Sequence, residues 1–139
     1  MRAGPRVMAP SRISVAVIVV LGLINVGRGS IHVFAPDGGL EMIAGLDISA
    51  SRPIVLAFIA SIGAGQLSFA LVDFAAAAAY RPFVRPLLLI HVVQAAMAAF
   101  VLFVWRPLPH EVPGQWGALA AVVVIGFFAA LEFSRKHHE

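Results

Sequence analysis

The sequence predicts an all-α membrane protein: a four-transmembrane antiparallel helix bundle with an interfacial or re-entrant segment between the first two helices. Hydrophobic residues make up 60% of the 139 residues and charged residues only 12%, whereas a soluble domain is roughly 25% charged. Such a chain cannot cover its apolar surface with polar groups, so lipid is its expected solvent. Four apolar windows of spanning length, with basic residues at their ends, complete the prediction.

The apolar windows define one membrane domain over residues 1–139, and each is close to the roughly 20 residues that an α-helix needs to span a bilayer. They cover residues 13–34, 53–79, 87–105 and 116–133. Arg28 and His32 interrupt the first window. The basic lead before it, residues 1–12, is similar to that of a signal peptide, but no small-x-small cleavage site follows. We therefore expect an uncleaved first transmembrane helix.

The basic residues predict the orientation of the chain in the membrane. Seven Lys and Arg residues fall on one side of the spans and three on the other, where acidic residues accompany them. The positive-inside rule then places both termini in the cytoplasm, as an even number of spans allows. We expect a multi-pass protein of the bacterial cytoplasmic membrane. The basic clusters are short and lie at the ends of apolar windows, which does not favour nucleic-acid binding.

The connections between the windows predict which helices are neighbours. The second and third windows are joined by the short segment YRPFVRP (residues 80–86), so we expect these helices to be antiparallel neighbours. The connection between the first two windows is longer and has a turn signal, DGG, at residues 37–39. The apolar residues among 40–48 then predict a short interfacial helix or re-entrant segment, with Glu41 and Asp47 facing water.

A first candidate binding cluster lies toward the cytoplasmic side. Asp73 is seven residues from the inner end of the second helix and His91 a few residues into the third, so the two are expected at similar depth. Gln94 follows on the same broad face as His91, and Gln66 lines the route outward from Asp73. An Asp–His pair in a low dielectric can hold a proton, bind a polar headgroup or orient a quinone carbonyl. Alternatively, the pair satisfies itself and fixes the register of the helices.

A second candidate cluster lies on the outer half of the first helix. Arg28 and His32 are four residues apart and share one helix face, with Asn25 one turn below Arg28. Together with the loop acids Asp37 and Glu41, they would form an outward cleft that binds an anionic group through the arginine. Alternatively, Arg28 extends its side chain to the lipid headgroups and pairs with a loop acid.

Other kinds of site are not indicated. The absence of cysteine excludes disulfides, thiolate metal sites and thiol catalysis. His32 and His91 are expected at very different depths and no span contains an HxxxH or HxxE motif, so we predict no metal site. No nucleophile motif and no phosphate-binding glycine loop occurs, so we predict no catalytic residue. Glu132 is expected to form a solvated ion pair with Arg135 or Lys136.

The segment GRGSIHVFAPDGGLEMIAGLD, followed by the IGAGQL helix and the YRPFVRP loop, is similar to the small four-helix bacterial membrane proteins of the DoxX-like kind. The resemblance covers the layout of the whole chain. Some members of that broad group are similar to subunits attached to quinone-linked or redox systems, which implies a membrane complex as partner. DoxX-like relatives that act in redox often work beside cysteine chemistry, which this chain lacks.

These observations favour a non-catalytic integral membrane protein, an accessory subunit or homo-oligomer that holds a lipid or quinone among its helices and needs no other cofactor. One alternative is a small proton-coupled carrier that uses Asp73 and His91 as a relay. Another is a membrane enzyme that acts on a lipid or quinone, which requires a cavity reaching the polar cluster.

Overall fold

The computed structural model describes residues 9–108 and 111–135. Within these ranges the long helices are α1 (Arg12–Phe34), α2 (Arg52–Ala78), α3 (Val84–Phe100) and α4 (Pro113–Ser134). Short segments flank them: the 3₁₀ turns η1 (Ser49–Ser51) and η2 (Arg81–Phe83), and the π-helical segment η3 (Val101–Trp105), which extends α3. The described ranges contain no β-strand, and four helical segments are long and apolar enough to cross a membrane. The all-helical class and the four candidate spans are therefore confirmed.

Local chemistry explains where the helices begin. The Ser11 hydroxyl accepts a 3.0 Å hydrogen bond from the backbone N–H of Ser14 and so caps α1. α3 begins at Val84 rather than at residue 87, although Pro86 lies in its first turn. A proline is tolerated there because the first N–H groups of a helix have no intrahelical acceptor. Pro113 starts α4 for the same reason.

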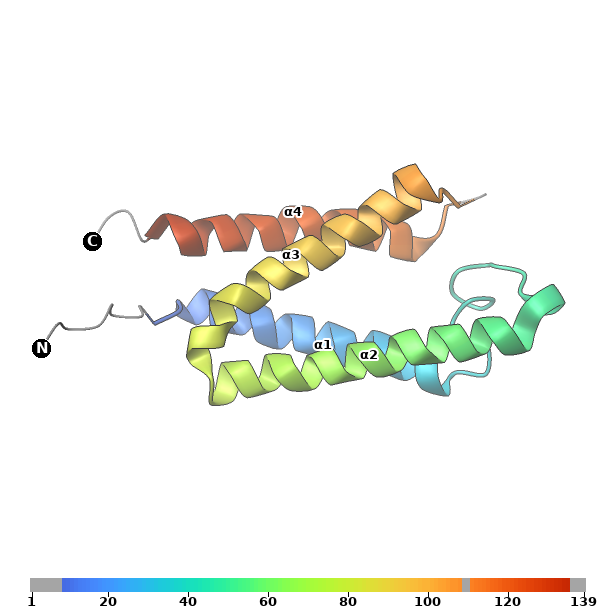
Figure 1. The fold of residues 1–139 in the computed structure, drawn as a ribbon, viewed down its shortest axis with the longest axis horizontal. Helices are drawn as coiled ribbons and strands as arrows, with labels where there is room; N and C mark the ends of the chain where they lie inside the picture. Colours follow the sequence, from blue (N-terminus) through green and yellow to red (C-terminus); the bar gives the residue numbers. More distant parts are fainter. Residues whose placement is uncertain (1–8, 109–110, 136–139) are drawn as a thin grey trace, which may run out of the picture.

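The helices form two hairpins, α1 with α2 and α3 with α4, and the contacts within each hairpin far exceed those between them. We call the end where residues 79–83 join α2 to α3 the turn end, and the end where residues 35–51 join α1 to α2 the loop end. The hairpins lie close together at the turn end and diverge toward the loop end (Figure 1). Gly29 and Gly63 let α1 and α2 approach closely, because a Cβ on either would lie 2.8 Å from the other's carbonyl oxygen.

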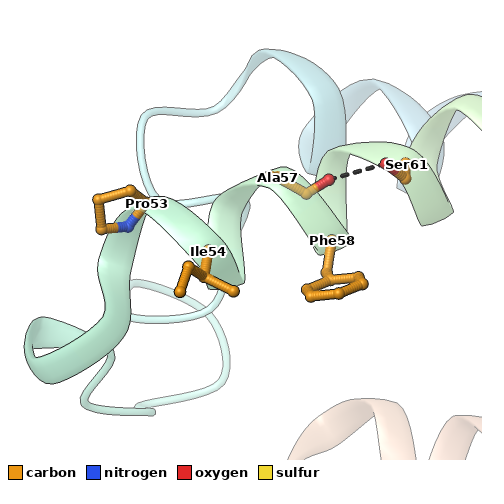
Figure 2. Close-up of a pocket in the computed structure, with 5 residues that line it drawn as sticks. All are labelled: Pro53, Ile54, Ala57, Phe58 and Ser61. Carbon is orange, nitrogen blue, oxygen red and sulfur yellow. Dashed lines mark hydrogen bonds between the residues drawn. The ribbon is translucent and has the colours of Figure 1, made fainter.

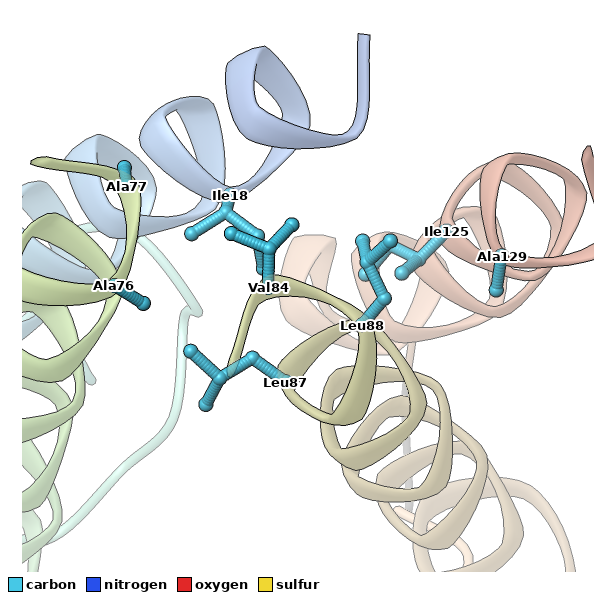
Figure 3. Packing of buried hydrophobic residues seen from close by; sticks show 8 residues of the cluster. All are labelled: Ile18, Ala76, Ala77, Val84, Leu87, Leu88, Ile125 and Ala129. Atoms are coloured by element: carbon cyan, nitrogen blue, oxygen red, sulfur yellow. The ribbon is translucent and has the colours of Figure 1, made fainter. Parts of the chain in front are cut away.

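A buried apolar cluster of eight residues lies at the turn end. It takes residues from early in α1 and α3 and from late in α2 and α4 (Figure 3): Ile18, Ala76, Ala77, Val84, Leu87, Leu88, Ile125 and Ala129. These side chains join the two hairpins. Elsewhere the helices leave large apolar residues exposed, such as Phe58 at 70% and Leu71 at 71%. Such a surface suits a lipid solvent.

Residues 36–44 form consecutive turns, so the short helix expected after the DGG signal is not formed. The Asp37 carboxylate accepts backbone hydrogen bonds from Met42 at 2.7 Å, Gly39 at 3.0 Å and Glu41 at 3.1 Å. These N–H groups are bound to a side chain instead of to helical carbonyls, which explains why the segment forms turns and not the expected helix. Gly38 and Gly39 have positive φ angles, which the turns require. Of the two acids expected in water, Asp47 is exposed, and Glu41 is partly exposed and pairs with Arg52 at 2.6 Å.

Candidate functional site: two buried polar clusters

The first polar cluster is built on Asp73 of α2 and His91 of α3. Asp73 is fully buried and His91 is 5% exposed. The His91 Nε2 atom lies 2.9 Å from Asp73 Oδ1. Because α2 and α3 run in opposite directions from one short turn, residues a similar distance from that turn share a depth. The structure thus brings these two predicted residues into direct contact, and the contact joins the two hairpins.

Two further residues hold this pair in place. Asn25 of α1 donates a long, 3.5 Å hydrogen bond from Nδ2 to Asp73 Oδ2. The ring of Phe69 packs edge-on against the ring of His91, with centroids 5.7 Å apart. Both carboxylate oxygens of Asp73 therefore have a partner, and the site is assembled from α1, α2 and α3. The sequence placed Asn25 with Arg28, and nothing in its spacing indicated that it would reach Asp73.

The chemistry open to this pair is proton storage and hydrogen bonding. The 2.9 Å contact between His91 Nε2 and Asp73 Oδ1 requires one proton between the two atoms. A neutral imidazole, an imidazolium or the protonated carboxyl group can each supply that proton. His91 Nδ1 makes no hydrogen bond within the described ranges, so it remains available to a further donor or acceptor.

The two predicted glutamines do not join the pair. Gln94 is exposed and makes no hydrogen bond to any other residue that the structure describes. Gln66 is half-buried, and its side-chain oxygen Oε1 is buried without a partner in the same part of the chain. Both glutamines lie on the loop-end side of Asp73 and His91. Both therefore keep hydrogen-bonding capacity that the protein does not use.

The predicted outer cluster is not assembled as one cleft. Arg28 is exposed, and it has no hydrogen bond or ion pair in the described portion of the chain. His32 Nδ1 lies 2.8 Å from the carbonyl oxygen of Gly38, so this histidine fastens the loop to α1. The loop acids are used elsewhere, Asp37 by backbone N–H groups and Glu41 by Arg52. Neither acid is a partner of Arg28.

A second polar cluster, which the sequence did not predict, lies at the turn end. Glu132 is 1% exposed, and its Oε1 accepts a 2.8 Å hydrogen bond from Arg85 Nε. Its Oε2 accepts a 2.6 Å bond from the Ser14 hydroxyl, and the backbone N–H of Ser11 adds bonds of 3.2 and 3.3 Å. The expectation that Glu132 forms a solvated pair is wrong, because Glu132 is buried and points inward, toward α1 and α3; Lys136 lies outside the described residues. An acid inside an apolar span was the available signal.

The described grooves are apolar and separate from both polar clusters. One, of about 370 Å³, is lined by Pro53, Ile54, Ala57, Phe58 and Ser61 on α2 (Figure 2). The Ser61 hydroxyl donates its proton to the Ala57 carbonyl in a 2.8 Å hydrogen bond, so only its acceptor capacity remains for a ligand. Another, of about 320 Å³, is lined by Val15, Val19, Phe74, Ala77 and Ala78. Within the described ranges no three His, Asp or Glu residues gather as metal ligands.

Comparison with protein-family models, with curated proteins and with solved structures finds no match to this chain.

Proposed function

We propose that this protein is a non-catalytic integral membrane protein, an accessory subunit or homo-oligomer in which buried polar pairs clamp two helical hairpins together. The observation that carries the proposal is the 2.9 Å contact between Asp73 and His91, which joins one hairpin to the other. The proposal includes the bacterial cytoplasmic membrane as the location, both termini on the cytoplasmic side, and a DoxX-like role beside a larger membrane complex.

The physical basis of the clamp is the cost of an acid in hydrocarbon. A carboxylate inside a bilayer is costly unless it has a partner, and Asp73 finds its partner on the opposite hairpin. Separation of the hairpins would leave His91 without its carboxylate and Asp73 with only the long hydrogen bond from Asn25, in an apolar medium. Glu132 also joins the hairpins, through the 2.6 Å hydrogen bond from Ser14 of α1, while its ion-pair partner Arg85 lies on α3 within its own hairpin.

The exposed helix surface supports a partner outside the chain. Only 11% of the most apolar 18-residue window of α2 is buried, so most of this helix is free to contact lipid or another subunit. Small exposed residues such as Gly65, which has open space around it, permit close approach of a neighbouring helix. The groove at Pro53–Ser61 has the apolar lining that an acyl chain or isoprenoid tail requires.

The test is the substitution Asp73→Asn, which keeps the size of the side chain and removes its charge. We expect a lower melting temperature in mild detergent, equivalent to about 1–2 kcal/mol, and a loss of any assembly that the wild type shows on size-exclusion chromatography with light scattering. Asp47→Asn is the matched control, because Asp47 is exposed and its hydrogen bonds go only to the nearby Ser49. An Asp73→Asn protein that melts and assembles like the control would refute the clamp.

A small proton-coupled carrier is the second candidate, favoured by the same Asp73–His91 contact. A buried carboxylate beside an imidazole can take up and release a proton at the depth where a carrier needs it. The test is pH-driven uptake into liposomes that contain the purified protein. Uptake that is abolished by Asp73→Asn and kept by Asp47→Asn would support the carrier, and uptake indifferent to Asp73→Asn would remove it.

A further inference from the structure

Two glutamines without a side-chain hydrogen bond among the described residues, Gln66 and Gln94, lie on the loop-end side of the Asp73–His91 pair. Gln94 is three residues beyond His91 on α3, about 4.5 Å nearer the loop end, and Gln66 is seven residues before Asp73 on α2, about 10 Å nearer the loop end. Gln66 Oε1 is buried without a partner among the described residues. A buried amide oxygen without a hydrogen bond is unfavourable, so this atom requires a donor that the described protein does not provide.

Helix geometry places both glutamines near the faces that carry the Asp73–His91 pair. Asp73 faces α3, where it contacts His91, and also α1, where it contacts Asn25. Gln66 lies only about 20° around α2 from Asp73, so it is on the same side of the helix. His91 points at α2, and Gln94 lies about 60° around α3 from it. The two amides therefore flank the route from the pair toward the loop end.

The two ends of this route differ. At the loop end the hairpins diverge (Figure 1), and no member of the large apolar cluster lies there. At the turn end the hairpins are joined by that cluster, in which Ala76, Val84 and Leu88 are 3%, 0% and 0% exposed (Figure 3). The Glu132–Arg85–Ser14 bonds close the same end with polar groups that already have partners.

We propose that water enters between α2 and α3 from the loop end, past Gln66 and Gln94, and reaches the Asp73–His91 pair, whereas the turn end stays closed to water. Gln66 Oε1 and His91 Nδ1 are the atoms that this water would bond. The pair then exchanges protons with one side of the membrane only. This inference goes beyond the proposed clamp, which needs the contact between Asp73 and His91 but no water.

The absence of cysteine makes the wild-type chain a ready background for accessibility measurements. A charged, membrane-impermeant maleimide modifies a cysteine only where water lets the thiol ionise. The informative variants are Gln94→Cys and Gln66→Cys on the route and Ala76→Cys in the closed end. Arg106→Cys and Tyr80→Cys, at exposed positions of the loop end and the turn end, report which side of a sealed vesicle is labelled.

Val93→Cys is the matched control for depth. Val93 lies beside Gln94 on α3 and is also exposed, but it lies about 160° around the helix from His91, on the side away from the pair, so it faces lipid. We expect Gln94→Cys and Gln66→Cys to react from the side on which Arg106→Cys reacts, about tenfold or more faster than Val93→Cys. Ala76→Cys should react from neither side.

Three outcomes would overturn the proposal: no reaction of Gln94→Cys and Gln66→Cys from the Arg106 side, equal rates for Gln94→Cys and Val93→Cys, or reaction of Ala76→Cys from the Tyr80 side. Two route positions are used so that one poorly folded variant does not decide the result. The melting temperature of Asp73→Asn tests the clamp separately, so failure of the water route and failure of the clamp give different results.

Discussion

Glu132 Oε1 accepts a 2.8 Å hydrogen bond from Arg85 Nε, and this contact joins the last turn of α4 to the first turn of α3. The Ser14 hydroxyl of α1 bonds the other carboxylate oxygen at 2.6 Å. Three helices therefore meet at one buried acid. The turn end is therefore fixed by charge as well as by apolar packing, whereas the helix backbones of the two hairpins diverge toward the loop end (Figure 1).

Removal of Glu132 should strongly destabilise the protein. Glu132→Gln leaves the buried Arg85 guanidinium without its counter-charge, at a cost of about 3–5 kcal/mol. Thermal unfolding in detergent measures the effect, with Arg135→Gln as the control because Arg135 is exposed. Combining Glu132→Gln with Arg85→Met should recover part of the loss, since no charge is then left unpaired. A Glu132→Gln protein as stable as Arg135→Gln would contradict the buried pair.

Asp73 and His91 should be energetically coupled. Because each is the partner of the other at 2.9 Å, the loss of stability in the double variant Asp73→Asn/His91→Gln should be smaller than the sum of the two single losses. We expect a coupling energy of about 1–3 kcal/mol from the double-mutant cycle. Asp73→Asn with Ser68→Ala is the comparison cycle, because the exposed Ser68 hydroxyl bonds only its own helix. Additive losses in the first cycle would show that the contact does not stabilise the fold.

Enlarging Gly63 should separate α1 from α2. A Cβ at this position would lie 2.8 Å from the Gly29 carbonyl oxygen and 2.8 Å from the Cβ atom of His32. The backbones must then move apart, and we expect Gly63→Ala to cost about 1–3 kcal/mol in thermal unfolding. Gly65→Ala is the control on the same helix, because a Cβ there meets nothing within 4 Å. Equal stability of the two variants would argue against the close approach.

The turns at residues 36–44 should depend on the charge of Asp37. Hydrogen bonds from the backbone N–H groups of Met42 and Gly39 hold the pKa of Asp37 below its ordinary value of 3.8. Because the folded pKa is lower than the unfolded one, the carboxylate stabilises the turns above pH 3.8. That contribution is lost as the pH falls through the lowered value.

Asp37→Asn imitates the protonated state at neutral pH. We expect faster hydrogen exchange at the backbone amides of Gly39 and Met42 in this variant, while Asp47→Asn leaves both rates as in the wild type. Unchanged protection of these amides in Asp37→Asn would mean that the carboxylate does not organise the turns.

The sequence by itself determined the solvent, the helical class and the four candidate spans. A span is a local property, because a segment of sufficient length and apolarity satisfies all its backbone groups as a helix wherever its neighbours lie. The common depth of Asp73 and His91 also follows from local information, since the short residue 80–86 connection fixes how far each lies from the turn.

Only the tertiary structure decided which polar groups meet. The rotation of each helix about its axis and the divergence of the hairpins arise from packing between distant segments, and hydropathy carries little information on either. The contacts of Glu132 are therefore with Arg85 and Ser14 and not with its neighbours in sequence. Asn25 likewise bonds Asp73, although the sequence grouped it with Arg28. The conformation of the loop after α1 also depends on such contacts, because the Asp37 carboxylate accepts hydrogen bonds from backbone N–H groups that would bond carbonyl oxygens in a helix.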